Sequence, residues 1–97
     1  MGRLSIEKIL KQIVEIAVKH GAEEVWLYGS YANGTNRRCS DIDIAVDKCN
    51  NLHDLMFDFN ENIHTLKTIN PVVLPRQEDE PNQLFRREIL DGKKIHG

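Results

Sequence analysis

The stretch from Asp41 to Asp47 alternates between aliphatic and mostly acidic side chains. The aliphatic set is Ile42, Ile44 and Val46, and the alternate set is Asp41, Asp43, Ala45 and Asp47. Successive side chains of a β-strand point to opposite faces of the sheet, so this pattern predicts a strand with one face in the core. The same pattern puts the carboxylates of Asp41 and Asp43 on one face.

Apolar residues at helical spacing predict a helix on each side of this strand. The first helix lies between Ser5, which suits an N-cap, and Gly21, which suits the position after the helix C-terminus; the second covers residues 52–66. The other predicted elements are short strands at 25–28 and 71–74, an acidic loop at 77–80, and a last helix that Pro81 opens and Gly92 closes. This order of helices and strands predicts one α/β unit without internal repeats.

Length and charge narrow the class of protein. The chain has 97 residues, which predicts a single domain over 1–97. Its 13 basic and 15 acidic residues give a net charge of −2, so we do not expect nucleic-acid binding by bulk electrostatics. We expect no membrane span and no secretory signal, and therefore reduced thiols at Cys39 and Cys49 in a cytoplasmic protein. A core of this size is marginally stable, which favours a partner protein or a homo-oligomer.

A glycine and a serine, Gly29 and Ser30, directly follow the apolar run 25–28. Glycine lets backbone N–H groups approach a ligand closely, and a serine can cap a short helix after it, so this turn suits a phosphate group. A Gly-Ser pair alone is more often an ordinary turn, and Asn33 with Gly34 also suits the tip of a β-hairpin.

The pair Asp41 and Asp43 supplies a second candidate feature. The rise of a strand separates their Cα atoms by about 6.5 Å. Two carboxylates directed at one point repel each other unless a cation lies between them, and hard oxygen ligands suit Mg²⁺ that enters with a nucleoside triphosphate. An Asp-x-Asp pair on an exposed strand is more often simply solvated. A triphosphate would fit between this strand and the Gly-Ser turn.

These residues resemble the signature of a known family. Gly29 and Ser30, ten further residues and then Asp41 and Asp43 fit the pattern G-S-x10-D-x-D of the minimal nucleotidyltransferases, which belong to the polymerase-beta-like superfamily. The segments that resemble the family are GSYANGTNRRCSDIDIAV, the helix and strand before it, and the closing LFRREILDGKKI. The resemblance implies a nucleotidyltransferase fold of the α+β class, in which helices pack on a small mixed β-sheet.

The resemblance also implies a reaction. In this family an acceptor hydroxyl attacks the α-phosphate of a nucleoside triphosphate, with ATP the expected substrate, and pyrophosphate leaves. By analogy, Gly29 and Ser30 would hold the triphosphate, and Asp41 and Asp43 would be the catalytic carboxylates that bind Mg²⁺ or Mn²⁺. Many small members are antitoxins paired with a helical HEPN-type toxin, and some attach AMP to a tyrosine of that toxin.

One departure from the family pattern concerns catalysis. Family members commonly carry a third carboxylate on the next strand, and the matching stretch 69–73 puts Asn70 at that position. An asparagine is neither a charged metal ligand nor a general base at neutral pH. Glu78 or Asp79 could substitute from the neighbouring loop, although a loop carboxylate is not pre-oriented.

A second departure lies after the Gly-Ser turn. Tyr31 and Asn33 stand where the family often has arginines, while Arg37 and Arg38 follow slightly later. The later arginines could reach a phosphate or simply be solvated.

The sequence therefore leaves three functions open. The first is a nucleotidyltransferase acting as an antitoxin, and the second is a catalytically degenerate member that neutralises its partner by binding. The second alternative stays open because Asn70 stands where the family commonly has a third carboxylate. The third, transfer to a small molecule such as an aminoglycoside, would need a substrate-binding domain from a separate chain.

The remaining apolar residues and histidines of the predicted 52–66 helix are interpreted as structural, not catalytic. Met56, Phe57 and Phe59 are expected to pack against the sheet, and any excess apolar surface there is a candidate for a partner or dimer contact. His53 and His64 lie about 16 Å apart along a helix, so one metal ion cannot bind both.

Overall fold

The computed structural model describes residues 6–34, 41–63, 65, 68–75 and 83–97. In chain order the elements are α1 (Ile6–Lys19), β1 (Val25–Tyr28), α2 (Ser30–Asn33), β2 (Ile42–Val46), α3 (Leu52–Asn62), β3 (Ile69–Val73), α4 (Gln83–Leu90) and β4 (Lys93–His96). None of the described helices combines the length and apolar character that crossing a membrane requires.

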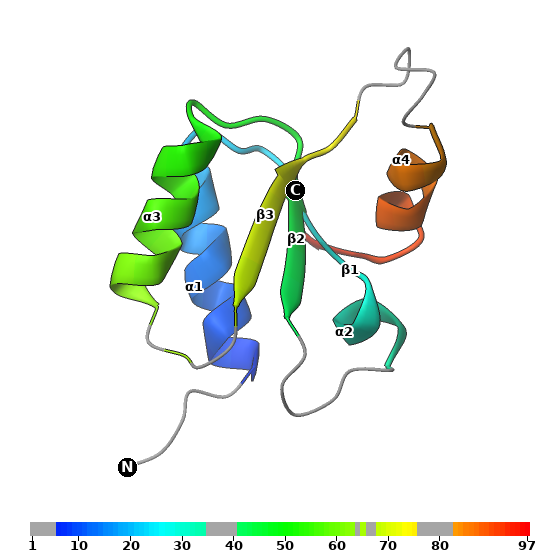
Figure 1. Cartoon of the computed structure of the whole chain (residues 1–97), viewed down its shortest axis with the longest axis horizontal. Coiled ribbons are helices and arrows are strands. Elements are labelled where there is room, and N and C mark those ends of the chain that lie inside the picture. The colour runs from blue at the N-terminus through cyan, green and yellow to red at the C-terminus, as the bar shows by residue number, and fades with distance from the viewer. Residues whose placement is uncertain (1–5, 35–40, 64, 66–67, 76–82) are drawn as a thin grey trace.

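Within the described residues, the strands form one mixed sheet in the order β3-β2-β1-β4. Strand β1 is antiparallel to both β2 and β4, whereas β2 and β3 are parallel. The register pairs Tyr28 with Asp43 and Asp43 with Asn70, so these three residues lie in one row across the sheet. Helices α1 and α3 cover one face of the sheet, and α2 and α4 lie on the other (Figure 1). The predicted fold class is thereby confirmed.

The main core lies between the sheet and helices α1 and α3. Its fully buried side chains include Ile9 and Ile13 of α1, Ile44 of β2, and Leu55 and Phe59 of α3. These positions follow the helical and strand periods of the sequence, which is why the pattern predicted both helices and the strand between them.

A smaller cluster covers the other face, and it corrects the prediction that β2 has only one face in the core. Ala45 is fully buried there with Tyr28 and Ile89. The rings of Tyr28 and Phe85 meet edge to face, with centroids 5.7 Å apart. Alanine is small enough to lie under α4, so the face that carries Asp43 is also partly closed.

Two helix boundaries are set by their caps. Gly21 has φ +100°, and the N–H of Ala22 donates to the carbonyl of Ala17, which ends α1 as predicted. Helix α3 begins after Asn51, whose side chain accepts a hydrogen bond from the Asp54 N–H.

The 52–66 prediction was wrong about the end of the helix and about one aromatic residue. Helix α3 ends at Asn62, because Ile63 adopts an extended conformation with φ −111° and ψ 110°. Phe57 is 67% exposed, since it projects from the side of α3 opposite the buried Leu55 and Phe59. Met56 is 38% exposed, so the prediction that it packs against the sheet was wrong as well.

Strand β4 was absent from the sequence prediction. Its sequence, Lys93 to His96, is mostly charged and exposed, so it has no apolar alternation that would indicate a strand. The turn before it explains its position: a Cβ at Gly92 would lie 2.3 Å from the carbonyl oxygen of Leu27. Glycine thus lets the chain pass against β1 and return along it as an edge strand.

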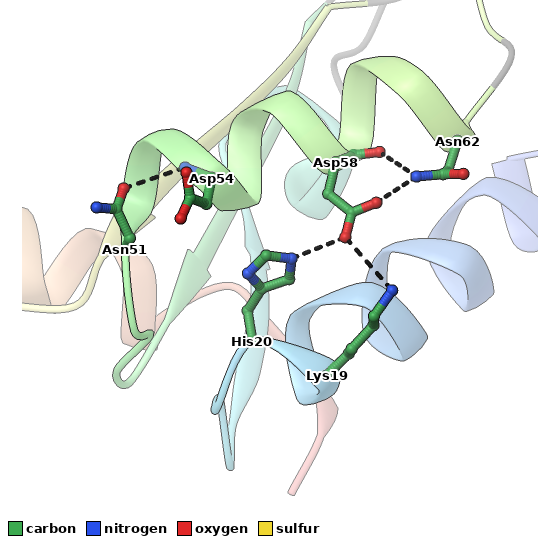
Figure 2. A network of polar contacts seen from close by, with 6 residues as sticks. All are labelled: Lys19, His20, Asn51, Asp54, Asp58 and Asn62. Carbon is green, nitrogen blue, oxygen red and sulfur yellow. Dashed lines mark hydrogen bonds and ion pairs between the residues drawn. The ribbon is translucent and has the colours of Figure 1, made fainter.

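A polar network joins α1 to α3 on the face away from Asp43 (Figure 2). The Asp58 carboxylate lies 2.7 Å from His20 Nε2 and 3.9 Å from Lys19 Nζ. The Asn62 amide also donates to the Asp58 side chain and, at 3.2 Å, to its backbone carbonyl. Asp58 and His20 are both largely buried, with side chains 15% and 17% exposed.

Candidate functional site

The two predicted carboxylates lie at the start of β2. Asp43 is half-buried within the strand, and Asp41 immediately precedes it and is exposed. The N–H of Ile42 donates to the carbonyl of Thr68, at 2.8 Å, which holds this end of β2 against the chain entering β3. Hydrophobic burial of Ile42 and Ile44 on the opposite face directs both aspartates away from the main core.

Asn70 lies beside these carboxylates, in the row predicted for a third carboxylate. It pairs with Asp43 in the parallel β2–β3 register. Its Nδ2 donates to Asp41 Oδ2 at 3.3 Å, and its side chain also forms a hydrogen bond with Asp43. One neutral amide therefore contacts both negatively charged groups.

Gly29 brings the Gly-Ser turn directly against the Asp43 carboxylate. Its φ of +74° is a left-handed conformation, and a Cβ built at this position would lie 2.6 Å from Asp43 Oδ2. The N–H of Ala32 donates to the Gly29 carbonyl at 3.1 Å and closes the turn into α2. Only glycine satisfies both the backbone angle and the close approach, so the turn and the carboxylate pair form one site.

Negative charges gather around Asp43. Burial raises the pKa of Asp43, the hydrogen bond from Asn70 opposes that change, and the charges of Asp41 and Glu88 add to it. Burial likewise raises the pKa of Tyr28 to about 12, with further contributions from Asp43 and Glu88. Neither Tyr28 nor Glu88 was predicted as a neighbour of the carboxylates. Pairing of β1 with β2 brings Tyr28 beside Asp43, and packing of α4 on the sheet brings Glu88 there.

A small cavity opens beside the turn. Its volume is about 170 Å³, and its lining residues are Gly29, Ala32, Glu88, Asp91 and Gly92. Helix α4 therefore forms one wall and the Gly-Ser turn the other.

The chemistry of the donors fits a hard divalent cation. Asp41 and Asp43 offer carboxylate oxygens, Asn70 has an amide oxygen, and the surplus of negative charge would be relieved by a cation. The described residues contain no group of three or more acidic, histidine or cysteine side chains arranged to hold a metal ion.

Several predicted candidates lie outside the described residues. They are Cys39, Arg37, Arg38, His64, Glu78 and Asp79. Of Ser30, only the backbone is described, as the first residue of α2. Cys49 is a half-buried free thiol whose pKa is raised by burial.

A comparison with known families identifies the domain. Residues 11–97 match the family described as polymerase beta, nucleotidyltransferase. The chain belongs to this family. As a nucleotidyltransferase domain, it carries the Gly-Ser turn and the carboxylate pair within the matched residues.

One curated relative matches part of this nucleotidyltransferase domain. It is the Methanocaldococcus jannaschii protein named "Putative protein adenylyltransferase MJ0435", which is 39% identical over 44 residues. The match spans 45% of this chain and 47% of the relative, so it covers less than half of either protein. No solved structure matches the chain.

Proposed function

We propose that this nucleotidyltransferase domain transfers AMP from ATP to a hydroxyl group of a partner protein, with Mg²⁺ or Mn²⁺ held by Asp41 and Asp43. The observation that carries the proposal is the close approach of the Gly-Ser turn to the carboxylates. A Cβ at Gly29 would lie 2.6 Å from Asp43 Oδ2, so this position excludes every side chain and leaves backbone beside the carboxylate.

The proposal gives each residue of the site a role. Gly29 and Ser30 bind the triphosphate at the start of α2, where glycine leaves the backbone N–H groups accessible. Asp41 and Asp43 hold the metal ion, and Asn70 orients both carboxylates through its amide. The metal ion, when bound, supplies positive charge that stabilises the negative charge of the transferring phosphoryl group.

Two lines support a protein acceptor. The matching Methanocaldococcus jannaschii protein is named a protein adenylyltransferase. The sequence also resembles the minimal nucleotidyltransferases, of which many are antitoxins paired with a HEPN-type toxin and some attach AMP to a tyrosine of that toxin. We therefore propose that the partner is such a toxin and that AMP is attached to one of its tyrosine hydroxyls.

Asn70 supports a second candidate function, a degenerate member that binds its partner without catalysis. The side chain opposite Asp43 is an amide that donates to a carboxylate, and an amide cannot accept a proton at neutral pH. By analogy with other groups that stabilise charge in active sites, loss of one carboxylate costs on the order of 3 kcal/mol of transition-state stabilisation.

The decisive experiment separates these two functions. The purified chain is incubated with α-labelled ATP, Mg²⁺ and a HEPN-type toxin encoded next to its own gene, and label on the toxin is measured. We expect label with the natural chain and a loss of at least about 100-fold with Asp43→Asn. A stable complex without label would overturn the catalytic proposal and support binding alone.

A calorimetric experiment tests the role of Asn70. Asn70→Asp adds a third carboxylate opposite Asp43, so Mg²⁺-dependent binding of ATP should tighten. Asn70→Ala is the matched control, since it removes the hydrogen bonds without adding charge. Unchanged or weaker binding in Asn70→Asp would show that position 70 does not face the metal ion.

A further inference from the structure

Strand β4 has an open edge beside an apolar groove. In the part of the chain that the structure describes, β4 pairs with β1 on one side and with no strand on the other. A groove of about 420 Å³ lies between α1 and this strand, lined by Glu7, Leu10, Lys11, Val14, Glu15 and Ile95. The half-buried Leu10, Val14 and Ile95 rest on the main core and form the floor of the groove.

An unpaired strand edge offers backbone N–H and carbonyl groups to another extended chain. In such a pairing, every second side chain of the added strand would point toward the α1 side of the sheet, where the groove lies. An apolar side chain at that position would cover Leu10, Val14 and Ile95. The edge and the groove therefore suit the same occupant, an extended segment with an apolar residue.

The charges on β4 indicate which kind of extended segment would bind there. Lys93 and Lys94 are exposed on β4, and neither forms an ion pair with another of the described residues. Lys94 lies 5.6 Å from the centre of the Trp26 ring. The rim residues on α1 are two glutamates, Glu7 and Glu15, and one lysine, Lys11, so the rim favours an apolar side chain over a carboxylate. The preference for carboxylates comes from the strand itself, above all from Lys94 on the face away from the rim.

The same lysines argue against a second copy of this chain as the occupant. Pairing of two β4 strands would bring Lys93 and Lys94 close to the lysines or His96 of the other copy. Like charges on neighbouring strands destabilise the pairing, and edge lysines commonly prevent it. An acidic strand from another protein meets no such repulsion.

We propose that the β4 edge and the α1 groove bind an extended acidic segment of a partner protein, which adds to the sheet beside β4. Its apolar side chain fills the groove over Leu10, Val14 and Ile95. Its carboxylates, at the alternate positions, point to the other face of the sheet and lie beside Lys94, which shares that face with Trp26. Helix α1 covers the face of the sheet opposite α2 and α4 (Figure 1), so the groove lies away from the Asp43 site. The proposal therefore does not depend on the nucleotidyl-transfer activity.

The test is a nuclear magnetic resonance titration of the full chain. The probe is a capped peptide in which glutamate and valine alternate. We expect shifts in the amides of β4 and in the methyl groups of Leu10 and Val14, and slower hydrogen exchange of β4 amides. A peptide with lysine in place of glutamate, or with a methylated central backbone nitrogen, should bind at least tenfold more weakly.

Variants of the chain provide a matched pair. Lys94→Glu should weaken binding of the acidic peptide about tenfold, because it reverses the charge that faces the glutamates of the peptide. The control Lys8→Glu, at an exposed position of α1, makes the same change of net charge and should alter binding less than about twofold. Equal binding of acidic and basic peptides, shifts that avoid β4, or no shifts at millimolar peptide would overturn the proposal. Self-association of the chain through β4, seen by sedimentation without peptide, would assign this edge to a second copy.

Discussion

Two aspartates on opposite faces of the sheet have opposite surroundings. Asp58 lies against His20, Lys19 and the Asn62 amide, and the hydrogen bond from His20 lowers its pKa (Figure 2). Asp43 lies among acidic neighbours with one amide, and burial together with those charges raises its pKa. Both carboxylates occupy partly closed positions, so the difference comes from their neighbours and not from exposure alone.

The contrast distinguishes a carboxylate that its partners stabilise from one that is held near like charges. The hydrogen bond from His20 and the ion pair with Lys19 strengthen the contact that Asp58 makes between α1 and α3. A carboxylate held near other negative charges stores repulsion, which a bound cation would relieve. The surroundings of Asp43 therefore support a ligand-binding role, and those of Asp58 support a structural role.

The largest effect is expected where the backbone touches Asp43. Gly29→Ala puts a Cβ 2.6 Å from Asp43 Oδ2 in a left-handed conformation, which should reduce the free energy of unfolding by about 3 kcal/mol. Gly34→Ala is the matched control, because Gly34 has φ +78° but nothing within 4 Å, and should cost about 1 kcal/mol. Urea unfolding measures both. Equal losses would mean that contact with Asp43 adds nothing to backbone strain.

The next comparison neutralises each aspartate in turn. Asp58→Asn removes the negative charge that pairs with Lys19 and weakens the hydrogen bond with His20, so it should lower the unfolding temperature. Asp43→Asn removes repulsion from Asp41 and Glu88, so stability should stay within about 0.5 kcal/mol of the natural chain or rise. Thermal unfolding of both variants and the natural chain at pH 7 measures these changes in stability. A larger loss in Asp43→Asn than in Asp58→Asn would contradict the assigned roles.

The pH dependence of stability should differ in sign between the two sites. The lowered pKa of Asp58 means that its contribution is present above the unfolded-state value, near 3.8, and is lost as the pH falls through the folded-state value. The raised pKa of Asp43 means that stability decreases as the pH rises from 3.8 through its folded-state value.

Denaturant unfolding between about pH 2 and 7 tests these signs. Asp58→Asn should flatten the loss of stability on the acid side of 3.8, and Asp43→Asn should remove the decrease just above it. Carbon resonances of the two carboxyl groups should show Asp43 titrating at higher pH than Asp58. The reverse order of the two titrations would show that their environments have been misassigned.

The smallest effect concerns Glu88. Glu88→Gln removes one negative charge near Asp43 and Tyr28, so the pKa of both groups should fall slightly. Asp91→Asn, in the lining of the same cavity, is the control and should change Asp43 less. Titration by nuclear magnetic resonance measures the carboxyl group. If the pKa of Asp43 were the same in both variants, Glu88 would not belong to the site.

Local patterns predicted most of the fold. The alternation of Ile42, Ile44 and Val46 predicted β2, and the helical spacing of Ile9 and Ile13 predicted α1, because both elements bury one face against the same core. Strand β4 was missed because its residues are mostly charged and exposed. It exists because β1 offers an edge to pair with and because Gly92 permits the approach.

Some residues of the candidate site were likewise predicted from the sequence, and others were found only in the structure. Gly29, Asp41, Asp43 and Asn70 were singled out from sequence, and the structure brings them together; their roles in binding and catalysis stay predictions. Glu88 carried no signal in the sequence, because an exposed glutamate on a short helix looks like any solvated residue. The partnership of His20 with Asp58 was also missed, since the two are 38 positions apart.

The sequence by itself determined the local elements of this protein, because periodicity, turn glycines and strand spacing act over a few residues. It put Asp41 and Asp43 on one face and a glycine where the backbone needs a positive φ. Only the tertiary structure decided which groups meet across the sheet. Packing of α4 brings Glu88 near Asp43, and packing of α3 against α1 brings Asp58 to His20. The charge environment, and with it the pKa of each carboxylate, depends on these long-range contacts.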